Sequence, residues 1–446
     1  MRNLTRISAL ILLTAGLGRY ELAASQTRRS AAGATASAVP TFSKDVAPIL
    51  YKNCTGCHRP GEIGPMSLLT YEEARPHAAD MKDEIMAGHM PPWHADPRFG
   101  TFLNERRLTD QEKQTIARWA DGGAPRGDAK DLPPMPQFPA GWSIGKPDAV
   151  FSMPTEYEVP ATGTIEYQYF EAPTNFTEDK WVQAIEIRPG AKAVVHHVLA
   201  YCREPTPSTR PQVLRQRADL GIPAPTPPAA PPTQTSPLPR PPRRLGTLVA
   251  TTAPGTNAMV FRPGSALLMK AGSTLVFQVH YTANGTPTKD RSSIGVVFAK
   301  EAPLDEMRAS QFLNGRLVIP AGAPDYKVDS EVGFNDDVHL WGLFPHTHLR
   351  GTRWEYQLVY PDGRTETILS VPGYDFNWQT YYMFEKPLVI PKGSRITASA
   401  WYDNSAAKKT NPDPKSEVRW GDQTWEEMQY TGLMYTVDSA RRKTGS

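Results

Sequence analysis

Two histidines stand two residues apart in the stretch LFPHTHLRGTRWEY, at His346 and His348. The residues that follow alternate from Trp354 to Tyr360 and then reach the turn PDG, a pattern typical of a β-strand. Residues i and i+2 of a strand point to the same face, so we expect the two imidazoles side by side. Two adjacent imidazoles are half of a transition-metal site, but this short motif identifies one only if further ligands lie nearby.

A second motif, NCTGCHRP, contains Cys54, Cys57 and His58. C-x-x-C-H is the signature of covalent c-type haem attachment, in which the thiols bond to the haem vinyl groups and the histidine becomes an iron ligand. A zinc knuckle would need further cysteines nearby, whereas the whole chain has 3. A redox-active dithiol is an alternative that leaves the histidine unexplained. We therefore predict one haem c at this motif.

Three of the histidines between these motifs also stand in recognisable sequence contexts. His196 and His197 are consecutive in AKAVVHHVLAYC, and His280 ends an alternating run in STLVFQVHYTANG. On that run Val276, Gln278 and His280 share one face, opposite a face of large apolar residues. Consecutive strand residues face opposite ways, so a metal shared by His196 and His197 would require a local twist or bulge.

The residues around the haem motif predict a small, mostly α domain over residues 40–126. We expect one helix from Tyr71 to Ala87. A second should begin after a Thr109 cap, with Glu112 in the capping-box position, and end at Gly122. This segment resembles a monohaem cytochrome c.

The resemblance to cytochrome c also suggests where a sixth iron ligand would lie. The stretch GHMPPWHADP holds Met90 at that place, followed by two prolines. His89 and His94 are alternatives, because histidine also ligates haem iron, and Met66 is a third.

Length and composition limit the class of protein. A chain of 446 residues is long enough for about three domains. Its 44 prolines and many short alternating runs favour strands joined by turns over a helical bundle. The net charge of +3, without a basic block, argues against a nucleic-acid partner.

The first residues, MRNLTRISALILLTAGLG, place two arginines before a short apolar run, and ELAASQ supplies small residues suited to cleavage after Ser25. This pattern predicts a signal peptide over residues 1–25, with an uncleaved anchor as the alternative. No second apolar run is long enough to span a bilayer. We therefore expect a periplasmic or secreted protein without a membrane span after cleavage. Export agrees with a c-type haem, which is attached after translocation.

The rest of the chain predicts two β domains after a proline-rich, semi-rigid linker at 127–147. We place them at residues 148–305 and 306–440. KAGSTLVFQVHYTANG and PKGSRITASAWYDNS share one order of turn, strand, aromatic residue and polar turn, which indicates related topology. A proline-rich insertion at 203–245 interrupts the first domain, and its composition does not support a packed core.

Residues 148–440 are similar to the copper type II, ascorbate-dependent monooxygenases, the family of peptidylglycine α-hydroxylating monooxygenase and dopamine β-monooxygenase. The motifs that carry the resemblance are VVHHVLAYC, FQVHYTANG, PHTHLRGTRW and TWEEMQYTGLMY, in the family's order. It implies two all-β jelly-roll sandwiches with one copper each, facing each other across an open, water-filled cleft. The implied ligands of the first copper are His196, His197 and His280. Those of the second are His346, His348 and Met428, whose soft thioether suits Cu(I).

The resemblance also implies an activity, the hydroxylation of a C–H bond of a small organic substrate with O₂. In the family the methionine-bearing copper activates oxygen, so His346, His348 and Met428 are the implied catalytic ligands, and the all-histidine copper delivers the second electron. Electrons would come from an ascorbate-like reductant or another redox protein and be relayed by the fused haem. The alternative is a non-catalytic electron-transfer or copper-handling protein, although a carrier needs only one site.

Two features depart from the family. Its animal members are braced by disulfides, whereas Cys202 is the only cysteine here outside the haem motif, so we expect core packing to replace them. We expect the Cys202 thiol to be buried and inert, with intermolecular pairing as the alternative. Peptide hydroxylases hold the substrate carboxylate with an arginine and a tyrosine, and the matching positions here are Phe344 and Gly432. Neither can anchor a carboxylate, which predicts a neutral or apolar substrate.

Overall fold

The computed structural model describes residues 38–442 except 140, 207–212, 217–244 and 254–257. The predicted signal peptide at 1–25 lies outside these residues, as does most of the proline-rich insertion. None of the described helices is long and apolar enough to cross a membrane.

The segment around the haem motif is helical, as expected from its sequence. It contains a π-helical turn (Phe42–Val46), α1 (Ala47–Asn53), α2 (Tyr71–Ala74), a 3₁₀ turn (Arg75–His77), α3 (Ala78–Met86) and α4 (Asp110–Asp121). The prediction of one continuous helix from Tyr71 was wrong, because Pro76 has no amide hydrogen to donate and the chain narrows to a 3₁₀ turn there. The predicted capping box of α4 is confirmed. The Thr109 hydroxyl accepts from the Glu112 amide at 3.2 Å, and the Glu112 carboxylate accepts from the Thr109 amide at 2.8 Å.

This helical segment has its own hydrophobic core. Phe42, Leu50, Ile116 and Trp119 are fully buried in it, and Phe42 packs on Trp119 with ring centroids 6.1 Å apart. The helices therefore bring the turn that carries the haem motif against a packed apolar interior.

The residues between α3 and α4 do not all stay with the helices. Trp93 and Phe102 are buried in the core of the second β domain, and Phe102 forms an isolated β-bridge with Phe384. Main-chain bonds continue that pairing, with the Leu103 amide donating to the Met383 carbonyl at 2.8 Å. The predicted domain at 40–126 did not include this packing of residues between α3 and α4 against the second β domain.

Most of the remaining chain is β structure. The first β domain contains β1 (Ala149–Ser152), β2 (Tyr157–Val159), β3 (Gln168–Pro173), β4 (Lys180–Arg188), β5 (Val195–Arg203), β7 (Thr247–Thr252), β8 (Met259–Val260), β9 (Ser265–Met269), β10 (Thr274–Tyr281), β11 (Thr288–Asp290) and β12 (Ser293–Phe298). The second contains β13 (Asp305–Leu313), β14 (Val318–Ile319), β15 (Tyr326–Phe334), β16 (Val338–His346), β17 (Gly351–Val359), β18 (Thr365–Val371), β19 (Tyr382–Ile390), β20 (Arg395–Tyr402), β21 (Val418–Arg419) and β22 (Tyr430–Val437). Short 3₁₀ turns lie at Ala129–Asp131 and Asp438–Ala440.

One nine-stranded sheet runs through both β domains. Its order is β1-β12-β4-β9-β13-β22-β16-β19, with β8 paired to β4. The parallel pair β9–β13 joins the two halves. The two domains also contain a four-stranded sheet (β3-β10-β5-β7) and a five-stranded sheet (β18-β17-β20-β15-β6), in which β6 is Leu214–Gln216.

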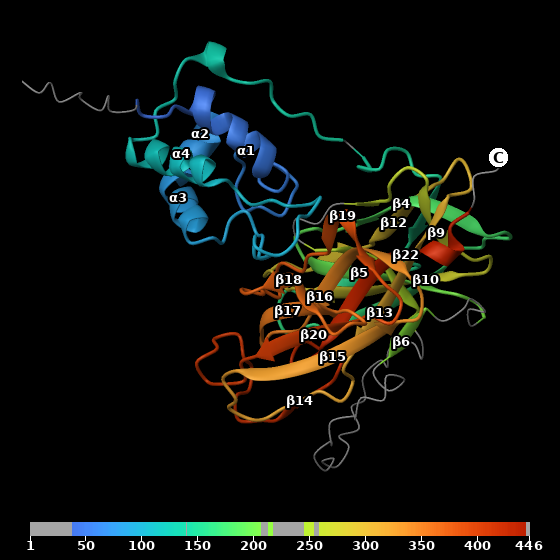
Figure 1. The fold of residues 1–446 in the computed structure, drawn as a ribbon. Helices are drawn as coiled ribbons and strands as arrows, with labels where there is room; N and C mark the ends of the chain where they lie inside the picture. Colours follow the sequence, from blue (N-terminus) through green and yellow to red (C-terminus); the bar gives the residue numbers. More distant parts are fainter. Residues whose placement is uncertain (1–37, 140, 207–212, 217–244, 254–257, 443–446) are drawn as a thin grey trace, which may run out of the picture. The chain divides into compact units, whose positions relative to one another are not determined.

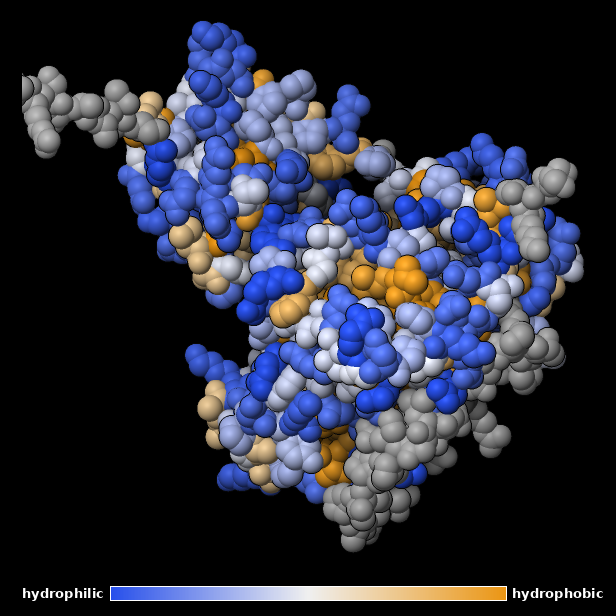
Figure 2. Space-filling model, in the orientation of Figure 1, coloured by the Kyte–Doolittle hydropathy of each residue, from blue (hydrophilic) through white to orange (hydrophobic). Residues whose placement is uncertain are grey.

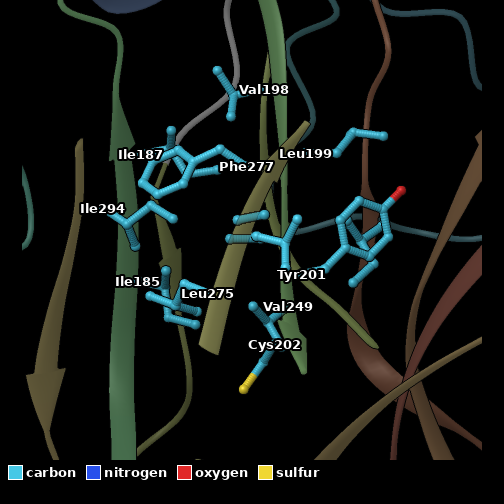
Figure 3. Close-up of a cluster of buried hydrophobic side chains, with 14 of the residues drawn as sticks. Ile185, Ile187, Val198, Leu199, Tyr201, Cys202, Val249, Leu275, Phe277 and Ile294 are labelled. Atoms are coloured by element: carbon cyan, nitrogen blue, oxygen red, sulfur yellow. The ribbon is translucent and has the colours of Figure 1, made fainter. Parts of the chain in front are cut away.

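Each domain has a hydrophobic core built by strands of its two main sheets. In the first core, Leu275 and Phe277 of β10 pack with β5, and Cys202 is buried there as expected (Figure 3). In the second, alternate residues Trp354 and Tyr356 of β17 are buried, as the alternating pattern predicted. On the face drawn in Figure 2, hydrophilic side chains cover most of the described surface.

Part of the insertion at 203–245 forms a strand and enters a hydrophobic core, which corrects the expectation from its composition. Residues Leu214–Gln216 form β6, which pairs with β15 of the second β domain. Val213 and Leu214 are buried in that domain's core, because these two apolar residues interrupt the polar and proline-rich run.

The attachment of the 93–104 segment to β19 can be tested at Asn104. Its side-chain amide donates to the Tyr381 carbonyl at 2.7 Å and accepts from the Met383 amide at 3.2 Å. Asn104→Ala should leave both main-chain groups unpaired, at a cost of about 1–2 kcal/mol. We expect native-state proteolysis within 93–108 to accelerate roughly 5- to 30-fold. Asn284→Ala, which removes only a local turn bond, is the control, and equal cleavage of both variants would contradict the assignment.

Candidate metal centres

A β-bulge brings three histidines together in the first β domain. β5 and β10 are antiparallel, with His280 opposite His197, and the register then shifts so that Tyr281 faces Val195. This is the local irregularity that the consecutive histidines required. The Nδ1 atom of His196 lies 3.0 Å from Nδ1 of His197 and 3.3 Å from Nδ1 of His280.

The chemistry of this cluster fits a metal ion. Ligand atoms of all three imidazoles lie within 4.8 Å of one another, and nitrogens about 2.0 Å from one ion would be separated in this way. Burial lowers the pKa of His197 well below its usual range. Burial first and His196 second lower the pKa of His280 to about 3. The imidazoles are therefore neutral near pH 7, which metal binding requires.

The sequence had suggested that His346 and His348 lie on one strand, but they do not. His346 is the last residue of β16, and His348 lies in the turn that follows. Their rings are nevertheless adjacent, with centroids 5.2 Å apart at an interplanar angle of 86°. Both are buried, and burial lowers the pKa of His346 to about 4.

The hydrogen bonds of this pair leave one nitrogen of each ring for a metal. Nδ1 of His346 donates to Oε1 of Gln379 at 2.7 Å, and Nδ1 of His348 donates to the Glu426 carbonyl at 3.2 Å. The lone pair then lies on Nε2 in both rings. Nε2 of His348 is buried without a hydrogen-bond partner, which is costly for a polar atom unless something else binds it. The pair therefore fits a metal held through Nε2.

Met428 lies just before β22, the strand that pairs with the strand of His346. β22 begins two residues later at Tyr430, which is opposite His346 on β16. The Met428 side chain is half-buried against the first core. Its amide donates to Glu427 at 3.2 Å, and the same carboxylate accepts from the His348 amide at 2.8 Å.

Glu427 is a site residue that the sequence reasoning did not single out, although it precedes Met428 in the quoted motif. It is fully buried and accepts from the amides of His348, Arg350 and Met428. Burial raises its pKa to about 7, against the opposing effect of these hydrogen bonds. One carboxylate thus ties the turn after β16 to the segment before β22.

The two histidine sets share aromatic neighbours, which corrects the implied open cleft. The ring of Tyr167 lies 5.0 Å from that of His280 and 6.1 Å from that of His348. The ring of Phe376 lies 5.4 Å from that of His196 and 6.0 Å from that of His348. Each of these two rings therefore contacts histidines of both sets. The sequence analysis did not predict Tyr167 or Phe376 as site residues, because their positions result from the packing of segments that are distant in the sequence.

The haem motif lies on the turn after α1. The amides of Cys57 and His58 both donate to the Cys54 carbonyl, at 3.0 and 2.9 Å, so the three side chains come from one tight turn. Burial raises the pKa of the Cys54 thiol to about 12 and lowers that of His58. Nδ1 of His58 is buried without a partner. Two thiols beside an imidazole suit covalent haem attachment.

The candidate sixth ligands differ in their surroundings. Met66 and Met90 both pack against the helical core, as does Cys54. His89 is exposed and bonds to Glu84 at 2.9 Å. His94 is half-buried, and burial lowers its pKa.

A cavity of about 540 Å³ links the haem motif with the first histidine set. Cys57 and Arg59 line it from the helical segment, and His196 and His197 line it from β5. An ion pair crosses between these parts, with Lys192 Nζ 2.7 Å from Glu62.

Comparison with known families supports the copper assignment for part of the chain. Residues 325–441 match the model of the copper type II ascorbate-dependent monooxygenase, C-terminal domain. The match contains His346, His348 and Met428 but covers less than half of the chain. It supports a copper monooxygenase-like function. No curated protein matches the chain.

Solved structures resemble the chain only weakly. The major capsid protein P2 of bacteriophage PM2 has 9% identity over 64% of this chain and 97% of its own, with a TM-score of 0.27. A putative secreted protein from Eubacterium rectale has 9% identity over 61% and 69%, with a TM-score of 0.20. Neither likeness is close enough to bear on function.

The pKa of His346 predicts how the metal-free protein responds to acid. Its imidazole loses its proton near pH 4 when folded but near pH 6.5 when unfolded. Between these values the unfolded state binds the extra proton, so the free energy of unfolding falls as pH decreases, and His346 alone contributes about 1.4 kcal/mol per pH unit to that fall. Denaturant titrations of metal-free protein from pH 7 to 4.5 should show this fall. His346→Gln should reduce the slope, and His77→Gln in the helical segment should not. Identical slopes in both variants would contradict the prediction.

Proposed function

We propose that the protein is an exported, copper-dependent monooxygenase that hydroxylates a C–H bond of a small organic substrate with O₂. It acts in the periplasm or outside the cell, and a covalently bound haem c relays electrons to copper. The observation that carries the proposal is the two histidine sets, of which the second lies in a segment that matches the C-terminal domain of a copper monooxygenase family.

The residues divide into two ligand groups. Nδ1 atoms of His196, His197 and His280 would hold one copper ion. Nε2 atoms of His346 and His348, with the thioether of Met428, would hold the other. Copper supplies oxygen activation and one-electron storage when it is bound. The chain keeps the imidazoles neutral by burial, sets which nitrogen faces the metal, and packs the rings of Tyr167 and Phe376 against them.

The cavity supports a direct electron path from the haem. One wall carries Cys57 of the attachment motif and another carries His196 and His197. A haem bound at Cys57 would therefore lie next to the first ligand group. The shared cavity is a stronger reason to propose internal electron transfer than the proline-rich linker is. The linker would only raise the local concentration of one domain near the other.

The surroundings of His346 support a neutral or apolar substrate. The ring of Phe344 stacks on that of His346, with centroids 6.0 Å apart at 15°, and Tyr381 stacks on Phe344. Gly432 is opposite Phe344 on β22. Phe344 and Gly432 themselves offer neither a cation nor a hydroxyl to a carboxylate, so peptides with a terminal carboxylate should be turned over poorly.

Metal content and the role of Met428 can be tested together. The protein should bind two copper ions and one haem. Met428→Ile should abolish hydroxylation, while one copper and the haem stay bound, because isoleucine has no ligand atom. Product formation and O₂ consumption with ascorbate as reductant give the activity, and elemental analysis gives the metals. Met86→Ile, on an exposed side chain of α3, is the control.

Retained activity in Met428→Ile would show that Met428 is only packing. A wild-type protein that binds two coppers but forms no hydroxylated product with any neutral or glycine-extended candidate would favour the electron-carrier alternative.

Internal electron transfer predicts a rate that does not depend on protein concentration. Haem should be reduced selectively in copper(II)-loaded protein by rapid mixing, and its oxidation followed by absorbance. The rate should stay constant over a tenfold dilution and be lost when His196 and His346 are both replaced by alanine. His77→Ala is the control. Oxidation that slows on dilution, or that survives in the double variant, would rule out the internal path.

A further inference from the structure

The segment Asp375–Gln379, which joins β18 to β19, contacts both histidine sets. Its sequence is DFNWQ. Oδ1 of Asn377 lies 3.2 Å from Nε2 of His196, and Oε1 of Gln379 lies 2.7 Å from Nδ1 of His346. Phe376 packs between the sets. No motif in the sequence pointed to these residues.

Both side-chain amides are oriented by bonds within the segment itself. Nδ2 of Asn377 donates to the Asp375 carboxylate at 2.9 Å, so its oxygen faces His196. Nε2 of Gln379 donates to the Phe376 carbonyl at 3.2 Å, so its oxygen faces His346. An amide oxygen can only accept a hydrogen bond. Each facing nitrogen of the histidines must therefore carry the proton.

The protonated nitrogen decides which ring nitrogen is left for a metal. His196 donates from Nε2, so its lone pair is on Nδ1, the atom that faces His197 and His280. His346 donates from Nδ1, so its lone pair is on Nε2. A single short segment thus selects opposite tautomers in the two sets.

Gln379 also lies between the sets. It is almost fully buried, and its Nε2 is 3.4 Å from Nδ1 of His197 while its Oε1 binds His346. One side-chain amide therefore spans from a histidine of one set to a histidine of the other.

We propose that Asp375–Gln379 is a shared positioning element, in which Asn377 orients His196 for the first metal and Gln379 orients His346 for the second. The inference rests on the proposed copper function. Hydrogen-bonded partners of metal-ligating histidines raise ligand basicity and hold the ring, and their loss typically costs about 10- to 100-fold in metal affinity.

Site-resolved copper affinity tests this assignment, because Asn377 contacts the first set alone, whereas Gln379 bonds closely to His346 of the second set and lies farther from His197 of the first. Full-length protein is titrated with copper against a competing chelator, and electron paramagnetic resonance distinguishes the two copper(II) sites. Gln379→Leu should weaken one site about 10- to 100-fold and the other site much less. The weakened site should be the one abolished by Met428→Ile. Asn377→Leu should do the reverse.

Conservative variants separate positioning from a purely structural role. Gln379→Glu keeps an oxygen that accepts from His346, so it should keep the affinity that Gln379→Leu loses. Gln357→Leu on β17, which loses only a bond to Glu355, controls for loss of a glutamine. The melting temperature of each metal-free variant reports folding.

The inference is overturned if Gln379→Leu leaves both affinities unchanged, or if every variant weakens both sites in proportion to its loss of melting temperature. The proposed function has a separate failure, which is a wild-type protein that binds fewer than two copper ions.

Discussion

Burial of neutral imidazoles is the constraint on which the site depends. His197, His346 and His348 are buried and His196 and His280 are partly buried, so a proton added to these rings would be poorly solvated and ring nitrogens are satisfied by hydrogen bonds instead. Asn377, Gln379 and the Glu426 carbonyl meet this need. What remains on each ring is a lone pair. A prearranged set of lone pairs is what a metal centre requires of a protein.

The sheet that runs through both β domains explains how two ligand sets can share neighbours. β9 and β13 pair across the domain boundary, so β5–β10 and β16–β22 belong to domains joined by main-chain hydrogen bonds and not only by a linker. Tyr167, from the first domain, and Phe376, from the second, each contact histidines of both sets. The relation between the sets is therefore a property of packed cores, which resist deformation.

The helical segment is connected to this framework by the same kinds of contact. Phe102 pairs with Phe384 beside β19, and β19 begins three residues after Gln379. The segment Asp375–Gln379, which orients the histidines, is thus followed closely by β19, the strand with which Phe102 of the 93–104 segment pairs. The cavity with Cys57 on one side and His196 on the other lies between elements held by these contacts.

The sequence by itself determined the local features. Thr109 and Glu112 dictated a helix start, alternation dictated β17, and consecutive histidines demanded the bulge found at His196. Such features depend on neighbours in the chain, so short-range patterns carry them. Only the tertiary structure decided that Phe376 and Gln379 serve both sets, that the 93–104 segment joins β19, and that no open cleft separates the histidines. Those outcomes depend on which side chains from distant parts of the sequence pack against one another, and no local sequence pattern specifies those contacts.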